Sequence, residues 1–301
     1  MSFIRAGTSK GLRDSELTSG IPSFEKVVIG SDLPLGSVLT VHQDWPKSSS
    51  NYSSALLKCY ISTALYASRH VYLVHPDPQY ITKFLESCPV QAVEESTSFK
   101  KESMEDKLKI AHRYKHLQLE EPAAVKQSHY LDLTSHLNLT NKTHLIHILE
   151  GSPSVDIEQN SLVILVDAFA PHSPMTISNI LDWKEKVRSK KSLLVVSVPE
   201  YCMEPQVASS LSFISDCVVQ IRSLSSSPQG QQPEFREYDG FAQLIKPLSI
   251  PFRCIIPSSL SVAFKCKSTR RFVFEPFHLP PDMSEAPSRQ LSNCSTKALD
   301  F

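Results

Sequence analysis

The sequence predicts an α/β fold of the doubly wound type, in which helices cover both faces of a mostly parallel sheet. Short runs rich in Val, Ile and Leu are bounded by polar residues, which is typical of strands buried on both faces. Helical patterns separate several of these runs, and this alternation favours right-handed crossover units. The predicted strands are residues 38–41, 71–74, 145–149, 162–166, 193–196 and 217–221.

Two of the separating segments have the apolar spacing of helices. In residues 52–68 the apolar side chains recur at helical spacing, and Ser53 or Ser54 is available as the N-cap. Residues 177–190 show the same spacing and form a second predicted helix. A third predicted helix covers residues 105–117.

The chain changes in character after residue 222. Residues 225–233 are dense in Ser, Gln, Pro and Gly, which indicates a flexible surface loop. The segments that follow are predicted strands, which would extend one edge of the sheet in antiparallel fashion; they are residues 241–249, 261–266 and 271–275. Residues 90–102 are polar and charged, and we expect them to form an exposed connection.

These elements predict one domain with two tails. A chain of 301 residues can bury one large core. We place that domain in residues 19–277. We expect residues 1–18 to form a flexible N-terminal arm. Residues 278–301 are expected to form a flexible C-terminal tail, since residues 287–300 are rich in Ser and have little to bury.

Composition argues against several classes of protein. Lys plus Arg equals Asp plus Glu at 31 each, so any site for a polyanion must be a local patch. The N-terminus lacks the apolar stretch of a secretory signal, and no apolar run is long enough to span a membrane. The seven cysteines show no paired spacing of a zinc site. We therefore expect a chain of the cytoplasm and nucleus, with reduced thiols and no bound metal.

The loop after the first predicted strand is where a nucleotide would bind in a doubly wound sheet. It contains Lys47 and Ser48, but the sequence has no glycine between Gly36 and Gly151, and a phosphate-binding P-loop needs glycines. Asp167 follows the strand 162–166, as a magnesium-positioning aspartate does in nucleotide hydrolases, although turns also favour Asp. Lys47, Ser48 and Asp167 are therefore weak cofactor candidates, and we expect no cofactor.

Other catalytic and metal-binding patterns find little support. The sequence has no Gly-x-Ser-x-Gly elbow and no cysteine in a recognisable protease signature. His112 and His116 could share a helix face, but no third ligand follows at a recognisable spacing. His144 and His147 would point to opposite faces of a strand. The sequence predicts no catalytic residue.

Two basic groups are the candidate RNA contacts. The first lies at the end of the helix 177–190 and comprises Lys184, Lys186, Arg188, Lys190 and Lys191. The second lies in a turn between two late strands and comprises Lys265, Lys267, Arg270 and Arg271. Cations also stabilise the C-terminus of a helix, and charge runs are often only solvated. If both groups reach one rim of an assembly, they could hold RNA phosphates with strong salt dependence.

Several segments resemble the family of Elongator complex subunit 4, in the same order and at similar spacing. The most specific are Lys-Leu-Lys-Ile-Ala-His-Arg-Tyr in residues 107–114 and His-Leu-Pro-Pro-Asp in residues 278–282. The other matching segments are residues 128–133, 211–219, 238–242, 277–284 and 299–301. Residues 19–24, Gly30 and residues 33–38 resemble the entry to a RecA-like core. The chain departs from the family at residues 7–9, at Gly30, where the family has three glycines, and at residues 42–44.

The resemblance implies a RecA-like subunit that joins Elongator subunits 5 and 6 in a hexameric ring, with two copies of each. It implies that this ring binds tRNA and assists the Elongator catalytic core in modifying the wobble uridine, U34. The family is associated with nucleotide hydrolysis by the ring. The glycine-free first loop favours a P-loop-deficient accessory chain that is not itself an enzyme.

Two alternatives remain open at this point. One is an active RecA-like ATPase or kinase that uses Lys47, Ser48 and Asp167. The other is a recombinase-paralogue-like DNA-binding protein, which would prefer single-stranded DNA to tRNA.

Overall fold

The computed structural model describes the greater part of the predicted domain. The described residues are 16–43, 48–93, 129–151, 153–170, 173, 175–224, 235–250, 253–254, 257, 261–266 and 270–277. The predictions for residues 105–117, the loop 225–233, the tail 278–301 and most of the arm lie outside them. In the last residues of the arm, β1 (Glu16–Leu17) pairs with β2 (Leu33–Pro34).

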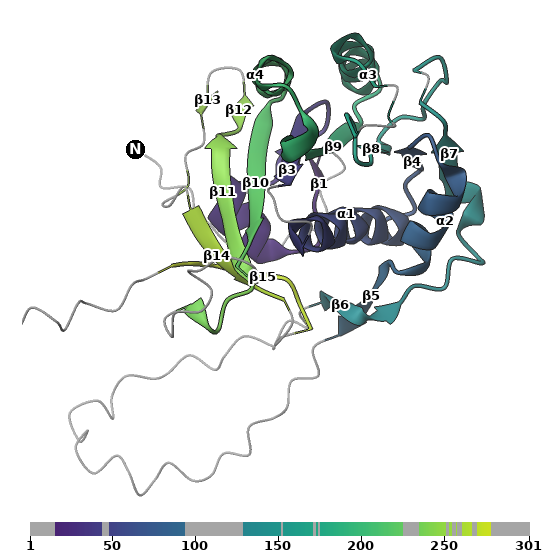
Figure 1. Cartoon of the computed structure of the whole chain (residues 1–301). Helices are drawn as coiled ribbons and strands as arrows, with labels where there is room; N and C mark the ends of the chain where they lie inside the picture. Colours follow the sequence, from purple (N-terminus) through teal and green to yellow (C-terminus); the bar gives the residue numbers. More distant parts are fainter. Residues whose placement is uncertain are drawn as a thin grey trace, which may run out of the picture.

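The main sheet has its strands in the order β15-β14-β11-β10-β3-β9-β8-β4-β7 (Figure 1). The strands from β10 to β7 are parallel, whereas β11, β14 and β15 add to one edge in antiparallel fashion. The parallel strands are β3 (Val38–Gln43), β4 (Val71–Val74), β7 (Ile146–Leu149), β8 (Leu162–Leu165), β9 (Leu193–Pro199) and β10 (Cys217–Ser223). The antiparallel strands are β11 (Gly240–Lys246), β14 (Ser261–Lys265) and β15 (Val273–Pro276).

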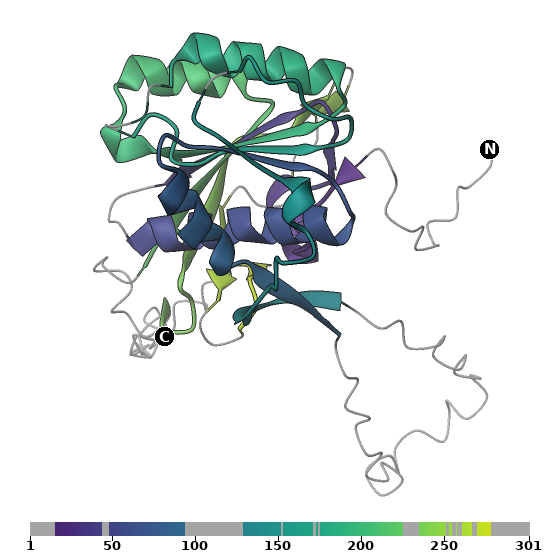
Figure 2. The same cartoon turned by 90° about the vertical axis from the view of Figure 1, so that its right-hand side faces the viewer.

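Helices cover both faces of this sheet (Figure 2). On one face, α1 (Ser48–Tyr66) and α2 (Pro78–Glu86) pack into a large apolar core. On the other, α3 (Ile177–Ser189) and α4 (Pro205–Ile214) enclose a second core around the buried Trp183. The predicted doubly wound α/β fold is therefore confirmed: the sheet is mostly parallel, with antiparallel strands at one edge.

Local sequence explains where the helices begin. Thr176 and Asn179 form a reciprocal capping box at the start of α3, and each side chain bonds the other's backbone N–H. At the start of α2, the Asp77 carboxylate accepts from the backbone N–H of Gln79, and Pro78 occupies the first helical position. The short α2 and α4 were not predicted from the sequence.

Residues 89–93 correct one prediction. We expected residues 90–102 to form an exposed connection. Instead, β5 (Pro89–Val93) covers the start of that segment and pairs with β6 (His129–His136) as a separate antiparallel ribbon. Because β6 lies far along the chain, its partner could not be found from local patterns. The predicted strand 145–149 is also shorter at its start, where a 3₁₀ turn occupies Thr143–Leu145. His144 lies in that turn, so it does not share a strand with His147.

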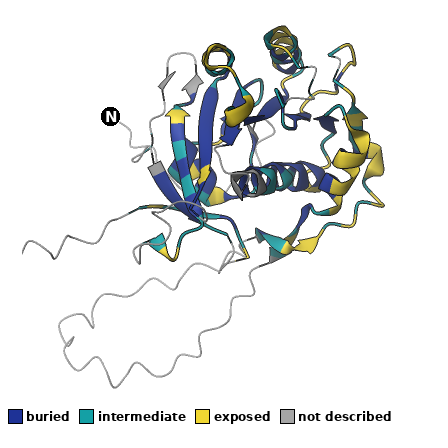
Figure 3. Cartoon of the chain, viewed as in Figure 1, coloured by how far each residue is buried: buried dark blue, intermediate teal, exposed yellow. Residues whose placement is uncertain are grey.

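The remaining elements are short. A π-helical segment, η1 (Phe24–Ile29), ends at Gly30, whose positive φ of 90° suits glycine. A 3₁₀ turn, η5 (Glu200–Cys202), follows β9, and β12 (Ser249–Ile250) pairs with β13 (Arg253–Cys254). The central strands are buried throughout, whereas much of α2 is exposed (Figure 3). No helix among the described residues is long and apolar enough to cross a membrane.

Candidate functional site

The carboxyl ends of β3, β8 and β9 meet at the crevice where doubly wound folds bind ligands. The chain leaves β3 on the α1 face and leaves β9 on the α4 face, so the sheet has its topological switch point between these two strands. Gln43 ends β3, Asp167 follows β8, and Ser197 lies near the end of β9. The fold thus brings three polar side chains from separate strands together.

These side chains hydrogen-bond to one another. The Gln43 amide Nε2 donates to Ser197 Oγ at 2.6 Å and to Asp167 Oδ1 at 3.1 Å. The Ser197 hydroxyl donates to the same Asp167 oxygen at 3.3 Å. Gln43 and Ser197 are buried, whereas Asp167 is partly exposed, so the network lies at the boundary between the core and the surface. Asp167 has a positive φ of 47°, which Asp tolerates better than most residues.

Tyr80 of α2 completes the network at the second carboxylate oxygen. Its hydroxyl donates to Asp167 Oδ2 at 3.1 Å, and its ring stacks on His75. Burial, followed by the negative charge of Asp167, raises the pKa of Tyr80, so the phenol keeps its proton over the physiological range. The Asp167 carboxylate therefore accepts bonds from neutral donors at both oxygens.

The arrangement holds the Asp167 carboxylate as a structural acceptor at the sheet edge. Three donors from the protein occupy most of the acceptor capacity of this carboxylate. Among the described residues, no group of three or more His, Cys, Asp or Glu side chains could hold a metal ion. Lys47 lies outside the described residues, and Ser48 begins α1 with a side chain that is not described.

The first basic group is largely engaged within the fold. Lys184 pairs with Asp216 at 3.2 Å and donates to the carbonyl oxygen of Ile214. Arg188 reaches the same Asp216 oxygen at 3.2 Å, although its side chain is 56% exposed. The second Asp216 oxygen accepts from the backbone N–H of Val38 at 2.9 Å. These contacts tie α3 to the segment before β10 and to the start of β3.

The remaining cations of this group differ in exposure. Lys186 donates to the carbonyl oxygens of Pro153 and Val155, and Lys190 pairs with Asp156 at 2.9 Å. Lys191 is exposed and has a positive φ of 50° in the turn before β9. Arg188 and Lys191 are therefore the cations of this group best placed to meet a polyanion.

The second basic group is also partly engaged. Lys265 pairs with Glu275 at 2.8 Å and with Glu237 at 3.3 Å, and the hydrogen bond to Glu275 raises its pKa. The Arg271 guanidinium lies 3.5 Å from the centre of the Tyr130 ring on β6. Arg270 is exposed. Lys267 lies outside the described residues.

The structure does not bring the two basic groups together within the chain. Lys190 and Lys191 precede β9, at the amino ends of the parallel strands. β14 runs in the same direction as β10, since both are antiparallel to β11, so Lys265 lies at the carboxyl ends. The two groups therefore lie at opposite ends of the strands and do not form one continuous patch on this chain.

Sequence reasoning identified Asp167 but missed the residues that bind it. Gln43 and Ser197 lie just after two predicted strands, and the carboxyl ends of parallel strands lie on the same side of a sheet. That rule places both side chains on the same side as Asp167, but it does not show which strands are neighbours. Tyr80 could not be identified from the sequence as a partner of Asp167, because the helix that carries it, α2, was not predicted.

Fold and site define a class: a doubly wound α/β protein in which the strand-end aspartate is held by the protein's own neutral donors. The chain belongs to the PAXNEB protein family, whose model matches residues 4–180 and 180–301. The resemblance to the family of Elongator complex subunit 4 is confirmed by the relatives.

The chain is similar to Elongator complex protein 4 from several animals. It is 24% identical to the Xenopus laevis protein, over 94% of this chain and 85% of that protein. It is 23% identical to the Homo sapiens protein, over 94% of this chain and 82% of that protein. Flagellar accessory protein FlaH of Methanocaldococcus jannaschii aligns at a TM-score of 0.49 with 9% identity, over 87% of this chain and 98% of that chain.

Proposed function

We propose that this chain is a non-catalytic subunit of the Elongator complex. In this proposal it forms a hexameric RecA-like ring with subunits 5 and 6, in the cytoplasm and nucleus. The ring binds tRNA and supports modification of the wobble uridine by the Elongator catalytic core. The family match over nearly the whole chain, with relatives named Elongator complex protein 4, carries the proposal.

The residues at the carboxyl ends of the parallel strands support the accessory role. A P-loop cradles phosphates with successive backbone N–H groups, which glycine makes accessible, and the segment between Gly36 and Gly151 has no glycine. Asp167, the candidate metal-positioning residue, is bound by Gln43, Ser197 and Tyr80. We therefore propose that the chain acts through its interfaces with other subunits, rather than through nucleotide hydrolysis at the carboxyl ends of its strands.

Affinity purification with mass spectrometry tests the assignment. The tagged chain should recover Elongator subunits 5 and 6 from cell extract in comparable amounts, together with the catalytic core. Recovery of the chain only as a monomer from extract would contradict the proposal.

Turnover measurements separate this proposal from the ATPase alternative. If the chain is accessory, Lys47→Ala and Asp167→Asn should leave ATP hydrolysis by the assembled ring unchanged. A loss of hydrolysis on either substitution would instead favour an active nucleotide site on this chain.

A further inference from the structure

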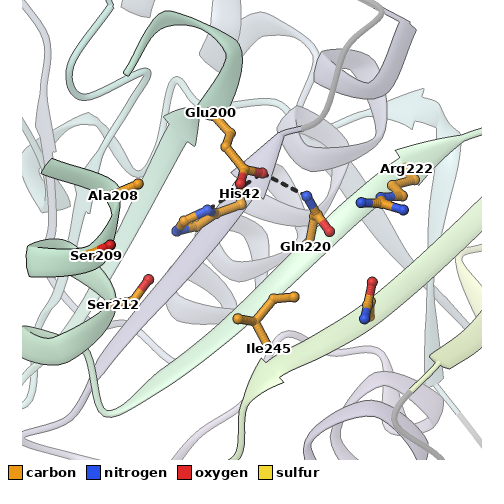
Figure 4. Close-up of a pocket in the computed structure, with 9 residues that line it drawn as sticks. His42, Glu200, Ala208, Ser209, Ser212, Gln220, Arg222 and Ile245 are labelled. Carbon is orange, nitrogen blue, oxygen red and sulfur yellow. Dashed lines mark hydrogen bonds and ion pairs between the residues drawn. The ribbon is translucent and has the colours of Figure 1, made fainter. Parts of the chain in front are cut away.

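A cavity of about 480 Å³ lies on the α4 face of the sheet, between α4 and strand β11 (Figure 4). Its polar lining comes from His42 on β3, from Gln220 and Arg222 on β10, and from Gln243 on β11. Ala208 of α4 and Ile245 of β11 add apolar walls. A mononucleotide or another small molecule fits a cavity of this size.

His42 is the feature that points to a ligand. Its side chain is only 5% exposed, and its Nδ1 lies 3.7 Å from Glu200 Oε2. The other ring nitrogen, Nε2, is buried and has no hydrogen-bond partner among the described residues. Figure 4 shows the Nε2 edge of the ring turned toward α4, where Ser209 and Ser212 line the cavity. Buried polar atoms are rarely left unpaired in folded proteins.

The protonation of His42 sets which group it can bind. Burial lowers the pKa of His42, and the Glu200 carboxylate only partly offsets this effect, so the imidazole is neutral at pH 7. The Glu200 carboxylate favours the proton on Nδ1, which leaves a lone pair on Nε2. The unpaired atom is therefore an acceptor that requires an N–H or O–H donor.

Gln220 supplies a second acceptor beside His42. Its amide nitrogen donates to Glu200 Oε2 at 2.6 Å, which fixes the orientation of the amide. Figure 4 shows the carbonyl oxygen of Gln220 turned away from Glu200. Gln220 is the register partner of His42 in the pairing of β10 with β3, so the two side chains stand beside each other in the cavity. Their acceptor atoms face different sides, and Arg222 lies further along the same strand as Gln220.

The charge of the cavity lining favours some ligands with an N–H or O–H donor over others. A guanidinium or ammonium group would meet the like charge of Arg222, whereas a neutral ring with an N–H group would not. A phosphate attached to that ring would gain from Arg222. The apolar side chains of Ala208 and Ile245, on opposite elements, suit the faces of a flat ring.

We propose that this cavity binds a nucleotide, with an N–H donor of the base on His42 Nε2 and the phosphate toward Arg222. The site lies on the α4 face, separate from the loop that contains Lys47 and Ser48, and it does not depend on the proposed function. The nucleotide is either free or part of an unpaired RNA strand, since both offer the same chemistry.

A comparison of two ligands on the full-length wild-type chain tests the proposal without any substitution. The probes are adenosine monophosphate and purine riboside monophosphate, which lacks the amino group and any ring N–H. Binding is followed by NMR of the histidine ring nitrogens and glutamine amides. Adenosine monophosphate should shift the His42 and Gln220 signals and bind at least tenfold more tightly. Measurable binding of both monophosphates with equal affinity would overturn the proposal.

An oligoadenylate RNA provides the second arm and identifies the source of the nucleotide. Shifts at His42 with the RNA but not the monophosphate assign the site to RNA, and the reverse assigns it to a free nucleotide. Both results support the site, whereas shifts with neither probe overturn it.

Substitutions localise the binding. His42→Phe should remove the tenfold preference, and His42→Gln, which keeps an acceptor, should retain part of it. His144→Phe, at an exposed imidazole, is the matched control and should bind like wild type. If His42→Phe does not fold, Gln243→Leu should still weaken binding several-fold. Unchanged affinity in the folded cavity variants would contradict the assignment.

Discussion

At the level of single residues, a buried carboxyl group ties the segment before η1 to the core. Glu25 is 3% exposed, and its Oε1 accepts from both the backbone N–H and the hydroxyl of Ser19 at 2.6 Å. Burial raises the pKa of Glu25 to about 7, and the bonds from Ser19 only partly oppose this effect. The folded protein therefore favours the protonated carboxyl group.

This environment predicts a pH-dependent stability. Because the folded pKa is above the ordinary value of 4.5, the stabilisation is complete below pH 4.5 and is lost as the pH rises to about 7. Glu25→Gln, which cannot ionise, should avoid a loss of roughly 3 kcal/mol over this window. Urea unfolding of both proteins at pH 5 and pH 8 measures the difference. Parallel pH profiles would contradict the prediction, and Glu185→Gln, at an exposed site, is the control.

Lys184 illustrates a candidate RNA contact that has a structural role. Its side chain is 14% exposed, and its removal leaves Asp216 and the Ile214 carbonyl without one donor. We expect Lys184→Ala to lower the free energy of unfolding by about 1–3 kcal/mol. Lys191→Gln, at an exposed position, should change it by less than about 0.5 kcal/mol. Equal effects in chemical denaturation would show that Lys184 is only a surface charge.

At the scale of elements, Gly240 marks the start of the antiparallel edge. It opposes Ser223 in the pairing of β10 with β11. A Cβ atom there would lie 2.1 Å from the carbonyl oxygen of Arg222 and 2.5 Å from the Phe264 ring. The close approach of β10 and Phe264 therefore requires glycine.

Gly240→Ala should consequently destabilise the protein by about 1–3 kcal/mol or more, as overpacking does in a well-packed core. Gly36→Ala is the comparison, because its Cβ would have room and would meet only the strain of a positive φ of 90°. Thermal unfolding of the two variants measures both effects. A cost at Gly240 no larger than that at Gly36 would contradict the packing argument.

The elements also show which features could be predicted from the sequence. The central strands were predictable because strands buried on both faces are continuous runs of Val, Ile and Leu, as in residues 162–165. β5 and β6 were not, since their ribbon is a separate small sheet and includes polar residues such as Gln91 and Asp132. Asp167 was found from its place after a strand, but its partners depend on which strands are neighbours, and strand order cannot be read from local patterns.

At the scale of the whole molecule, the two basic groups lie at opposite ends of the sheet. Their separation means that the two groups can be neutralised and tested one at a time. Several of these cations, including Lys186 and Lys265, already bind carbonyl or carboxylate oxygens of the chain. A test of RNA binding should therefore begin with the exposed ones.

We expect Arg188→Gln combined with Lys191→Gln to weaken RNA binding by the assembled ring about equally across sequences, because phosphate contacts carry no base readout. The dependence of log affinity on log salt should also become less steep. Filter binding at several salt concentrations measures both quantities. Neutralising Arg188, Lys184, Lys186 or Lys190 requires a parallel stability measurement, because each holds a contact within the fold. Unaltered affinity together with an unaltered salt slope would count against this group.

The central claim is that the chain is a ring subunit whose interfaces carry its function. Native mass spectrometry of the chain, mixed with purified Elongator subunits 5 and 6, tests it most directly. If the chain is such a subunit, the dominant species should have the mass of two copies of each subunit. A mixture that contains only the separate chains at micromolar concentration would rule the ring out.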